Sequence, residues 1–578
     1  LTKADGSLQA SNNLSDLAAP ATARTNLGLG TAATMTPASL AADSAFSGMY
    51  APKASPTFTG TVTVPTPVNS TDAATKAYVD QGGAGVSWQA LPIFLSTGAL
   101  QIATGAPSML VATSGSISVP GWSMSGNTAG QSIAGMVTGL PAQCAAVKIE
   151  LITTNSSATT GLYHVWQIYG GQPNEGDSLS INQIIGDPRI KASPASATLQ
   201  TILLEEYLPV IPSRPLFLRI ARQPADTADT WTGSVIVAGL RVTPLPAPSS
   251  PIQIQAQDAY NSWPMITAVG SKLVCMFSRG AMHGQPDITR QIWGSSSTDG
   301  GQTWSASSLK IDNASLDDST VGRGLDSSGN LLLWTRQDTA SNAETHSLYR
   351  STDGGNTFSL LSSPTFANLP IQISDIFSVP TVGLMAFFHT STPLGTSTSW
   401  GIVKSTDDGN TWTQTTVETG LTTDTWPTEI SGAYIGGGKI IAIARSNSNN
   451  TTTIKSQFQI TSTDYGATWT KAATNITDVT TSTPSLIYDG SAGLLSLYYY
   501  RRGSLASLRR RVVSANTIFS SPLSWPDPTI IATGSTSLTE AGNVNACVLG
   551  SNHIAAFYNG PDAGNTGIYA TILAAPTS

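Results

Sequence analysis

The chain repeats one eight-residue phrase four times at nearly constant spacing. The phrase, Ser-Thr-Asp-x-Gly-x-Thr followed by Trp or Phe, occupies residues 297–304, 351–358, 405–412 and 462–469, and its aspartates lie 54, 54 and 57 residues apart. A fixed period of this length is typical of propellers and solenoids. Each period holds four strands of about six residues plus turns, and residues 249–578 hold about six periods. The repeat therefore predicts a six-bladed β-propeller over residues 249–578.

Each position of the phrase has a structural use. The glycine permits positive φ in a tight turn, and the aspartate can accept backbone N–H bonds within that turn. The aromatic residue provides a large apolar anchor between neighbouring blades. We therefore interpret these residues as structural rather than catalytic: Asp299, Asp353, Asp407 and Asp464, with Trp304, Phe358, Trp412 and Trp469.

The phrase resembles the Asp box of sialidases and related propellers. The resemblance covers about 320 residues and implies a sialidase-like six-bladed propeller. It implies function only weakly, because Asp boxes also occur in proteins that are not sialidases.

Residues 89–248 form a second predicted domain. Short alternating apolar segments recur between turn-forming clusters, at 91–95, 108–112, 146–152, 163–169, 201–204, 216–221 and 235–242. Such a series predicts a β-sandwich, and the proline-rich segment 244–251 predicts a stiff linker after it. The role of this domain stays open between carbohydrate binding and a spacer or trimer-packing function.

Residues 1–88 contain apolar side chains that a single chain cannot bury in a compact core. Two phrases stand out, N-L-S-D-L-A-A-P-A-T-A-R-T-N-L-G-L-G at 13–30 and S-P-T-F-T-G-T-V-T-V-P-T-P at 55–67, the second followed by A-T-K-A-Y-V-D at 74–80. Together they resemble the repeat phrases of tail fibres and tailspikes of tailed phages. The resemblance implies a homotrimeric shaft that attaches to other tail or baseplate proteins of a virion or phage-derived tail particle. It places the protein outside the cell, at the host surface.

Composition excludes several other classes of partner. Only 11% of the residues are charged, with a net charge of −7 and 28 basic residues, which argues against nucleic acid as the main partner. No apolar run reaches the roughly 18 residues of a membrane-spanning helix. Cys144, Cys275 and Cys547 lie far apart and match no metal-ligand spacing. We expect no metal or other cofactor.

The predicted hairpins place a set of basic side chains at one end of the propeller. The second strand of each blade ends at Arg279, Arg336, His389, Arg445, the Arg501–Arg502 pair and Asn559, in that order. The first strands begin at the same end, with Trp263, Asp375, Glu429, Ser485 and Asn543. Guanidinium groups bind carboxylates through two parallel hydrogen bonds, so this ring is a candidate ligand site. The alternative is that exposed strand ends simply favour arginine.

Glu429 is the strongest catalytic candidate in this set. The segment 429–445 resembles the sialidase segment that carries a catalytic glutamate and the second arginine of the carboxylate-binding triad, and Arg501 or Arg502 lies near the third. Ser262 stands at the first arginine position, and the nucleophilic tyrosine would fall near Asn543. Asp287 lies in the loop that carries the sialidase aspartic acid. The remaining set resembles phage endosialidase tailspikes, although Glu429 could equally form a structural ion pair with Arg445.

Three functions remain possible at this point. The first is a receptor-binding fibre that recognises an anionic bacterial surface polysaccharide without cleaving it. The second is a glycoside hydrolase of endosialidase type, which degrades a capsule or another polymer of sialic-acid-like sugars. The third is a structural spacer, which would bind no glycan.

Overall fold

The computed structural model describes residues 19 and 22 and most of residues 108–578. Within that range the gaps fall at 115–116, 125–130, 143, 156–161, 174–182, 187–188, 193–198, 227–228, 249, 342–343, 391–397, 447–455, 479–481, 504–505, 538, 561–563 and 578. The predicted trimeric shaft and the expected strand at 91–95 lie outside the described residues. The described part is almost entirely β-structure, which confirms the all-β fold class.

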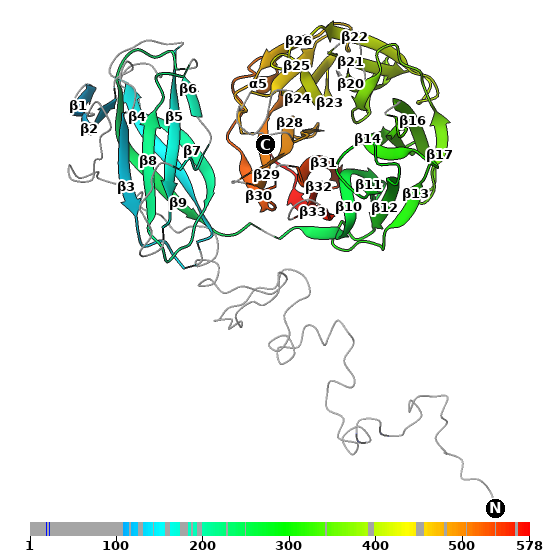
Figure 1. Cartoon of the computed structure of the whole chain (residues 1–578), viewed down its shortest axis with the longest axis horizontal. Coiled ribbons are helices and arrows are strands. Elements are labelled where there is room, and N and C mark those ends of the chain that lie inside the picture. The colour runs from blue at the N-terminus through cyan, green and yellow to red at the C-terminus, as the bar shows by residue number, and fades with distance from the viewer. Residues whose placement is uncertain are drawn as a thin grey trace, which may run out of the picture. The chain divides into compact units, whose positions relative to one another are not determined.

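A β-sandwich comes first in the described chain (Figure 1). One sheet has the order β1 (Ser108–Ser114), β2 (Ile117–Met124), β9 (Val235–Leu245), β4 (Ala146–Asn155) and β7 (Gln200–Pro209). The other has the order β3 (Ser132–Val137), β8 (Leu216–Arg222), β5 (Tyr163–Gly171) and β6 (Arg189–Ala192). Side chains from both sheets, including Ile149, Leu204 and the fully buried Trp166, form one apolar core. Strands β2, β3 and β6 were not expected, because they are short or contain proline and glycine.

Six blades follow, and Figure 1 shows them arranged around a central axis. Blade two contains β14 (Asp317–Leu325), β15 (Leu331–Asp338), β16 (Glu344–Ser351) and β17 (Ser359–Ser362). Blade three contains β18 (Pro370–Ile373), β19 (Phe377–Val379), β20 (Gly383–Thr390), β21 (Ser399–Ser405) and β22 (Thr413–Thr419). Blade four contains β23 (Pro427–Gly436), β24 (Lys439–Ser446), β25 (Phe458–Ser462) and β26 (Thr470–Ala473). Blade five contains β27 (Ser485–Asp489), β28 (Leu494–Arg501), β29 (Ser507–Ser514), the short helix α5 (Ala515–Phe519) and β30 (Thr529–Thr533).

Blades one and six share a strand. Blade one contains β10 (Ile252–Val269), β11 (Lys272–Gly280), β12 (Gln291–Ser297) and β13 (Ser308–Ile311), and blade six contains β31 (Ala541–Leu549), β32 (Asn552–Asn559) and β33 (Thr566–Ala574). The first half of β10 pairs with β33, and its second half pairs with β11. The outermost strand of blade six therefore comes from the beginning of the propeller sequence, and this pairing closes the ring.

The four Asp boxes form identical turns between the third and fourth strands of blades one to four. In the first box, Ser297 Oγ donates to Asp299 at 2.7 Å, and the backbone N–H of Thr303 donates to the same carboxylate at 3.0 Å. Hydrogen bonds from Thr303 lower the pKa of Asp299 to about 2. The box aromatics contact the preceding blade: Trp412 lies 5.1 Å from Trp334, and Trp469 lies 5.2 Å from Phe387, measured between ring centroids.

Candidate functional site

A cavity of about 750 Å³ lies at the end of the propeller opposite the Asp boxes, where the first strands begin and the second strands end. All six blades contribute to its lining: Trp263, Arg336, His389, Glu429 with Arg445, Arg502, and Asn543. This volume falls within the range typical of ligand sites, roughly 300–1,000 Å³. We refer to this cavity as the axial pocket.

Strand register explains why three basic side chains from different blades meet there. Ser319 pairs with Arg336, Gln372 with His389, and Thr428 with Arg445, in each case near the end of the first hairpin of a blade. Equivalent positions in equivalent hairpins point the same way, so these side chains converge on the axial pocket.

Two of the expected arginines do not line the axial pocket. Ser278 pairs with Ser262, which directly precedes Trp263 as Thr428 precedes Glu429, so Arg279 lies one residue further along its strand. A shift of one residue turns a side chain to the opposite face of a strand. Arg279 accordingly forms an ion pair with Asp258 at 2.7 Å.

Arg501 and Arg502 are adjacent in the chain, so their side chains point in opposite directions and only one of them reaches the axial pocket. Arg501 forms an ion pair with Glu205 of the sandwich strand β7 at 3.4 Å. Arg502 lines the axial pocket. The expectation that both Arg279 and Arg501 share the ligand site is therefore wrong.

Glu429 and Arg445 form an ion pair in the wall of the axial pocket. Arg445 Nε lies 2.8 Å from Glu429 Oε2, and both side chains are only partly buried. The backbone N–H of Glu429 donates to His389 Nδ1 at 3.2 Å. Burial, together with the positive charges of Arg445 and Arg336, lowers the pKa of His389 to about 3, so His389 is a neutral acceptor in this contact.

Arg336 is held from behind by buried carboxylates. Its Nε lies 3.0 Å from Asp338 Oδ2 and 3.3 Å from Glu344 Oε1. Burial raises the pKa of Glu344 to about 7, against the opposing effect of the Arg336 charge. The protonation state of Glu344 therefore determines how much of the Arg336 charge is compensated near neutral pH.

Blades five, six and one meet in a chain of polar contacts around Arg502. Arg502 Nη2 donates to Tyr558 Oη at 2.9 Å and to Asn543 Oδ1 at 3.4 Å. Tyr260 Oη lies 2.5 Å from His283 Nδ1, and His283 lines the axial pocket. Burial and the charge of Arg502 lower the pKa of His283, which favours its neutral form.

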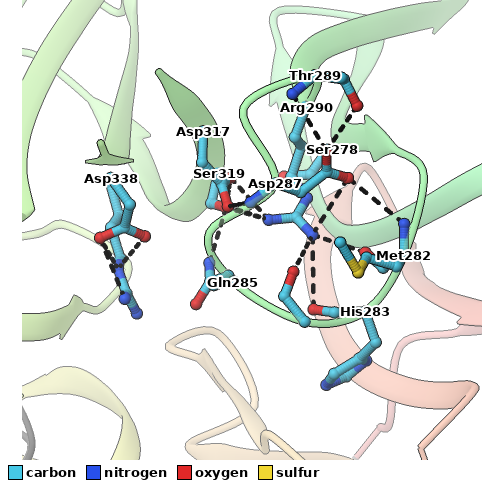
Figure 2. A network of polar contacts seen from close by, with 12 residues as sticks. Ser278, Met282, His283, Gln285, Asp287, Thr289, Arg290, Asp317, Ser319 and Asp338 are labelled. Atoms are coloured by element: carbon cyan, nitrogen blue, oxygen red, sulfur yellow. Dashed lines mark hydrogen bonds and ion pairs between the residues drawn. The ribbon is translucent and has the colours of Figure 1, made fainter. Parts of the chain in front are cut away.

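Asp287 does not face the axial pocket. Figure 2 shows its carboxylate turned into its own loop, where it accepts bonds from the backbone N–H of Ala281 at 2.7 Å and from Thr289 Oγ1 at 2.6 Å. Although burial opposes the change, these hydrogen bonds lower the pKa of Asp287. The same loop is fixed by Arg290, which pairs with Asp317 at 2.6 Å. The sialidase resemblance implied a catalytic role for Asp287, and these contacts give it a structural role instead.

The residues that this loop presents to the axial pocket are His283 and Gln285. In Figure 2 the His283 ring points away from the Asp287–Arg290 network. Gln285 Nε2 donates to Ser319 Oγ at 2.9 Å. The sequence offered only a weak signal for these residues, because a loop has no periodicity that fixes which side chains turn inward.

The described residues contain no group of three or more His, Cys, Asp or Glu side chains that could hold a metal ion. The three cysteines are buried and unpaired. Among the described helices, none has the length and apolar character needed to cross a membrane.

One sequence model of a known domain matches part of the propeller. The sequence model of the BNR repeat-like domain matches residues 271–535. A search of curated proteins found no match. Among solved structures, a protein of unknown function from Dyadobacter fermentans is 17% identical with a TM-score of 0.48, covering 57% of this chain and 99% of that chain.

Two sialidases are also similar in structure. Hadza microbial sialidase Hz136 is 13% identical with a TM-score of 0.42, covering 76% of this chain and 95% of its own. The NanB sialidase of Streptococcus pneumoniae is 10% identical with a TM-score of 0.42, covering 76% of this chain and 99% of its own. With identities of 10–17% and TM-scores of 0.42–0.48, these similarities carry no conclusion about what this chain does.

Proposed function

We propose that this protein recognises an anionic bacterial surface glycan through the axial pocket, as the receptor-binding part of a phage tail fibre, tailspike or phage-derived tail particle. One observation supports glycan recognition most strongly. Arg445 and Arg502, which can bind carboxylates, line the same cavity as the aromatic rings of Trp263 and Trp426. Sugar rings pack against aromatic faces, while their acidic groups need paired donors.

The proposal for the tail particle rests on the sequence of residues 1–88. Their repeat phrases favour a homotrimeric shaft that binds other tail proteins and holds the propeller at the host surface. A complex of three chains would present three axial pockets to one polysaccharide, and such multivalency raises the overall affinity without any new contact. Light scattering on the intact protein tests this part, since a monomer contradicts it and a trimer that dissociates on removal of residues 1–88 supports it.

Hydrolysis of the bound glycan is the second candidate function. Glu429 and His283 both line the axial pocket, one from blade four and one from the loop of blade one. Burial lowers the pKa of His283, and the charge of Glu429 opposes this effect, so the two groups interact electrostatically. A carboxylate and a neutral imidazole can divide the work of general acid and general base.

Replacement of Glu429 by Gln separates binding from hydrolysis. If the protein cleaves its ligand, E429Q abolishes the release of reducing ends yet preserves glycan binding, because only the proton-transferring group is lost. If the protein only binds, wild type releases no reducing ends and E429Q retains its affinity within a few-fold. Glu418→Gln is the matched control, since Glu418 pairs with Lys471 outside the axial pocket. The absence of binding to every acidic polysaccharide would contradict both candidates and favour a spacer.

A further inference from the structure

The first strands of blades one to four and of blade six shift register where they reach the axial pocket, and three of them share one form of irregularity. In blades one, four and six the pairing register shifts within 262–265, 428–431 and 542–545. Each irregularity contains one residue other than glycine with positive φ: Trp263 at 51°, Glu429 at 49° and Asn543 at 44°. This backbone conformation is unfavourable for most residues other than glycine. All three residues line the axial pocket.

The same conformation occurs elsewhere only in turns, as far as the described residues show. Ser315, Thr381, Asp408 and Tyr465 have positive φ and lie in turns that do not line the axial pocket. In a turn, positive φ is part of the local geometry. In a strand it interrupts pairing and redirects one side chain, as β-bulges do beside functional sites. Trp263, Glu429 and Asn543 therefore form one set, defined by equivalent placement in three blades.

Asn543 is the member of this set without a candidate role. Its Oδ1 accepts from Arg502 Nη2 at 3.4 Å, which orients the amide so that Nδ2 points elsewhere. None of the hydrogen bonds within the described part of the chain uses Asn543 Nδ2. The side chain is only partly buried.

The preceding residue shows that the backbone is fitted closely around Arg502. Gly542 has φ 115°, and a Cβ atom there would lie 2.9 Å from Ser482 Oγ and 3.2 Å from Arg502 Nε. The guanidinium group and the Asn543 amide are thus held together by a backbone that admits no side chain at 542. Both groups carry N–H donors at one corner of the axial pocket.

We propose that Asn543 contacts the ligand, donating Nδ2–H to a carboxylate or carbonyl oxygen of an acidic saccharide beside Arg502. This corner, built from blades five and six, is separate from the Glu429–Arg445 pair of blade four. The axial pocket therefore recognises acceptor oxygens of the ligand at two places. This inference rests on the proposed function of the pocket as a glycan site.

The test compares two substitutions at Asn543 with one control. Wild-type protein is first screened against polysialic acid, hyaluronan, alginate and neutral dextran, and calorimetry then uses the acidic polymer that binds best. N543G relieves the backbone and removes the amide, so its melting temperature should equal or exceed that of the wild type while its affinity falls about tenfold. N543D retains the shape and tolerates positive φ but repels an acidic ligand, so its affinity should fall further. Thr381→Gly relieves positive φ outside the axial pocket and should leave affinity unchanged.

The outcomes distinguish this inference from the function on which it rests. Suppose that the wild type binds an acidic polymer and that N543D binds it equally well at a wild-type melting temperature. Asn543 is then not a ligand contact, whereas the proposed function of the pocket is retained. The same conclusion follows if N543G binds as the wild type does. If the wild type binds none of the acidic polymers, the glycan function fails and the role of Asn543 fails with it.

Discussion

At one end of the propeller, four turns repeat the same hydrogen bonds, whereas at the other end each blade presents a different side chain to the axial pocket. In every Asp box the carboxylate accepts bonds from the same serine and threonine positions within its own turn. At the axial pocket, contacts run between blades instead, as from Arg502 in blade five to Asn543 in blade six. One end has identical, local contacts, and the other has varied, non-local ones.

This difference separates the residues that stabilise the fold from the residues that line the axial pocket. A repeated turn stabilises each blade independently of any ligand. Positive φ at Trp263 and Glu429 in strands, by contrast, stabilises no turn and is costly for such side chains. Substitutions at the Asp-box end should therefore lower stability, whereas substitutions at the axial pocket should lower ligand affinity.

The largest effect is expected at Trp412. Its ring packs against Trp334 of the preceding blade, so W412A should lower the free energy of unfolding by about 3 kcal/mol. Affinity per folded molecule should be unchanged. Chemical denaturation and glycan binding measured on the same samples provide the check. W263A should instead reduce affinity more than stability, although its ring also packs over the guanidinium group of Arg290. A stable W412A protein that no longer binds glycan would assign function to the Asp-box end.

The next effect is expected at Arg445. R445A removes a charge-assisted contact worth about 1.5–3 kcal/mol, so affinity for an acidic glycan should fall at least about tenfold. R445K should restore it only in part, because an ammonium group cannot make two parallel hydrogen bonds. Calorimetry measures both. Arg279→Ala is the matched control, and an equal loss in that variant would show that general positive charge, rather than the axial pocket, attracts the glycan.

A smaller effect is expected on the pH dependence of stability, through the titration of Glu344. Its pKa in the folded protein, about 7, lies above the ordinary value, so the stability that its protonated form provides is complete at acid pH. That stability is lost as pH rises from about 4.5 through 7. E344Q should flatten the melting temperature across this interval, as differential scanning calorimetry would show. An unchanged slope in E344Q would mean that another group titrates there.

The smallest effect is expected at an individual Asp box. In D407N the amide still accepts one bond, but the charged partner of Thr411 is lost from an exposed turn. The melting temperature should fall by no more than a few degrees, and glycan affinity should not change. A larger loss of affinity than of stability would connect this turn to the axial pocket.

The sequence predicts the two ends with unequal success. The repeated phrase was sufficient to predict the Asp boxes and the number of blades. Counting residues along each predicted hairpin placed Arg336, His389 and Arg445 at one end of the propeller. Counting failed for Arg279 and Arg501, because an error of one residue reverses the direction of a strand side chain. The sialidase resemblance misplaced Asp287, and no sequence pattern pointed to His283, because the orientation of both side chains depends on contacts within a loop.

Asn543 shows a different limit. The sequence placed it at the start of a first strand, where a sialidase-like tyrosine is missing, and gave it no role of its own. Its contact with Arg502 and its positive φ depend on the meeting of two blades, which no local pattern encodes. The shaft, the trimer and the location on a virion stay predictions, because residues 1–88 lie almost entirely outside the described part of the chain.

The shared strand β10 has a consequence for how this protein is made. Its first half can acquire its partner β33 only after about 300 further residues have left the ribosome. Until then blade six lacks its outer strand, and the first half of β10 is an unpaired sheet edge that could join another nascent chain. Where several chains are synthesised close together, correct closure means that each β10 pairs with the β33 of its own chain. Exchange of this strand between neighbours would yield an interlocked particle with intact pockets but linked rings.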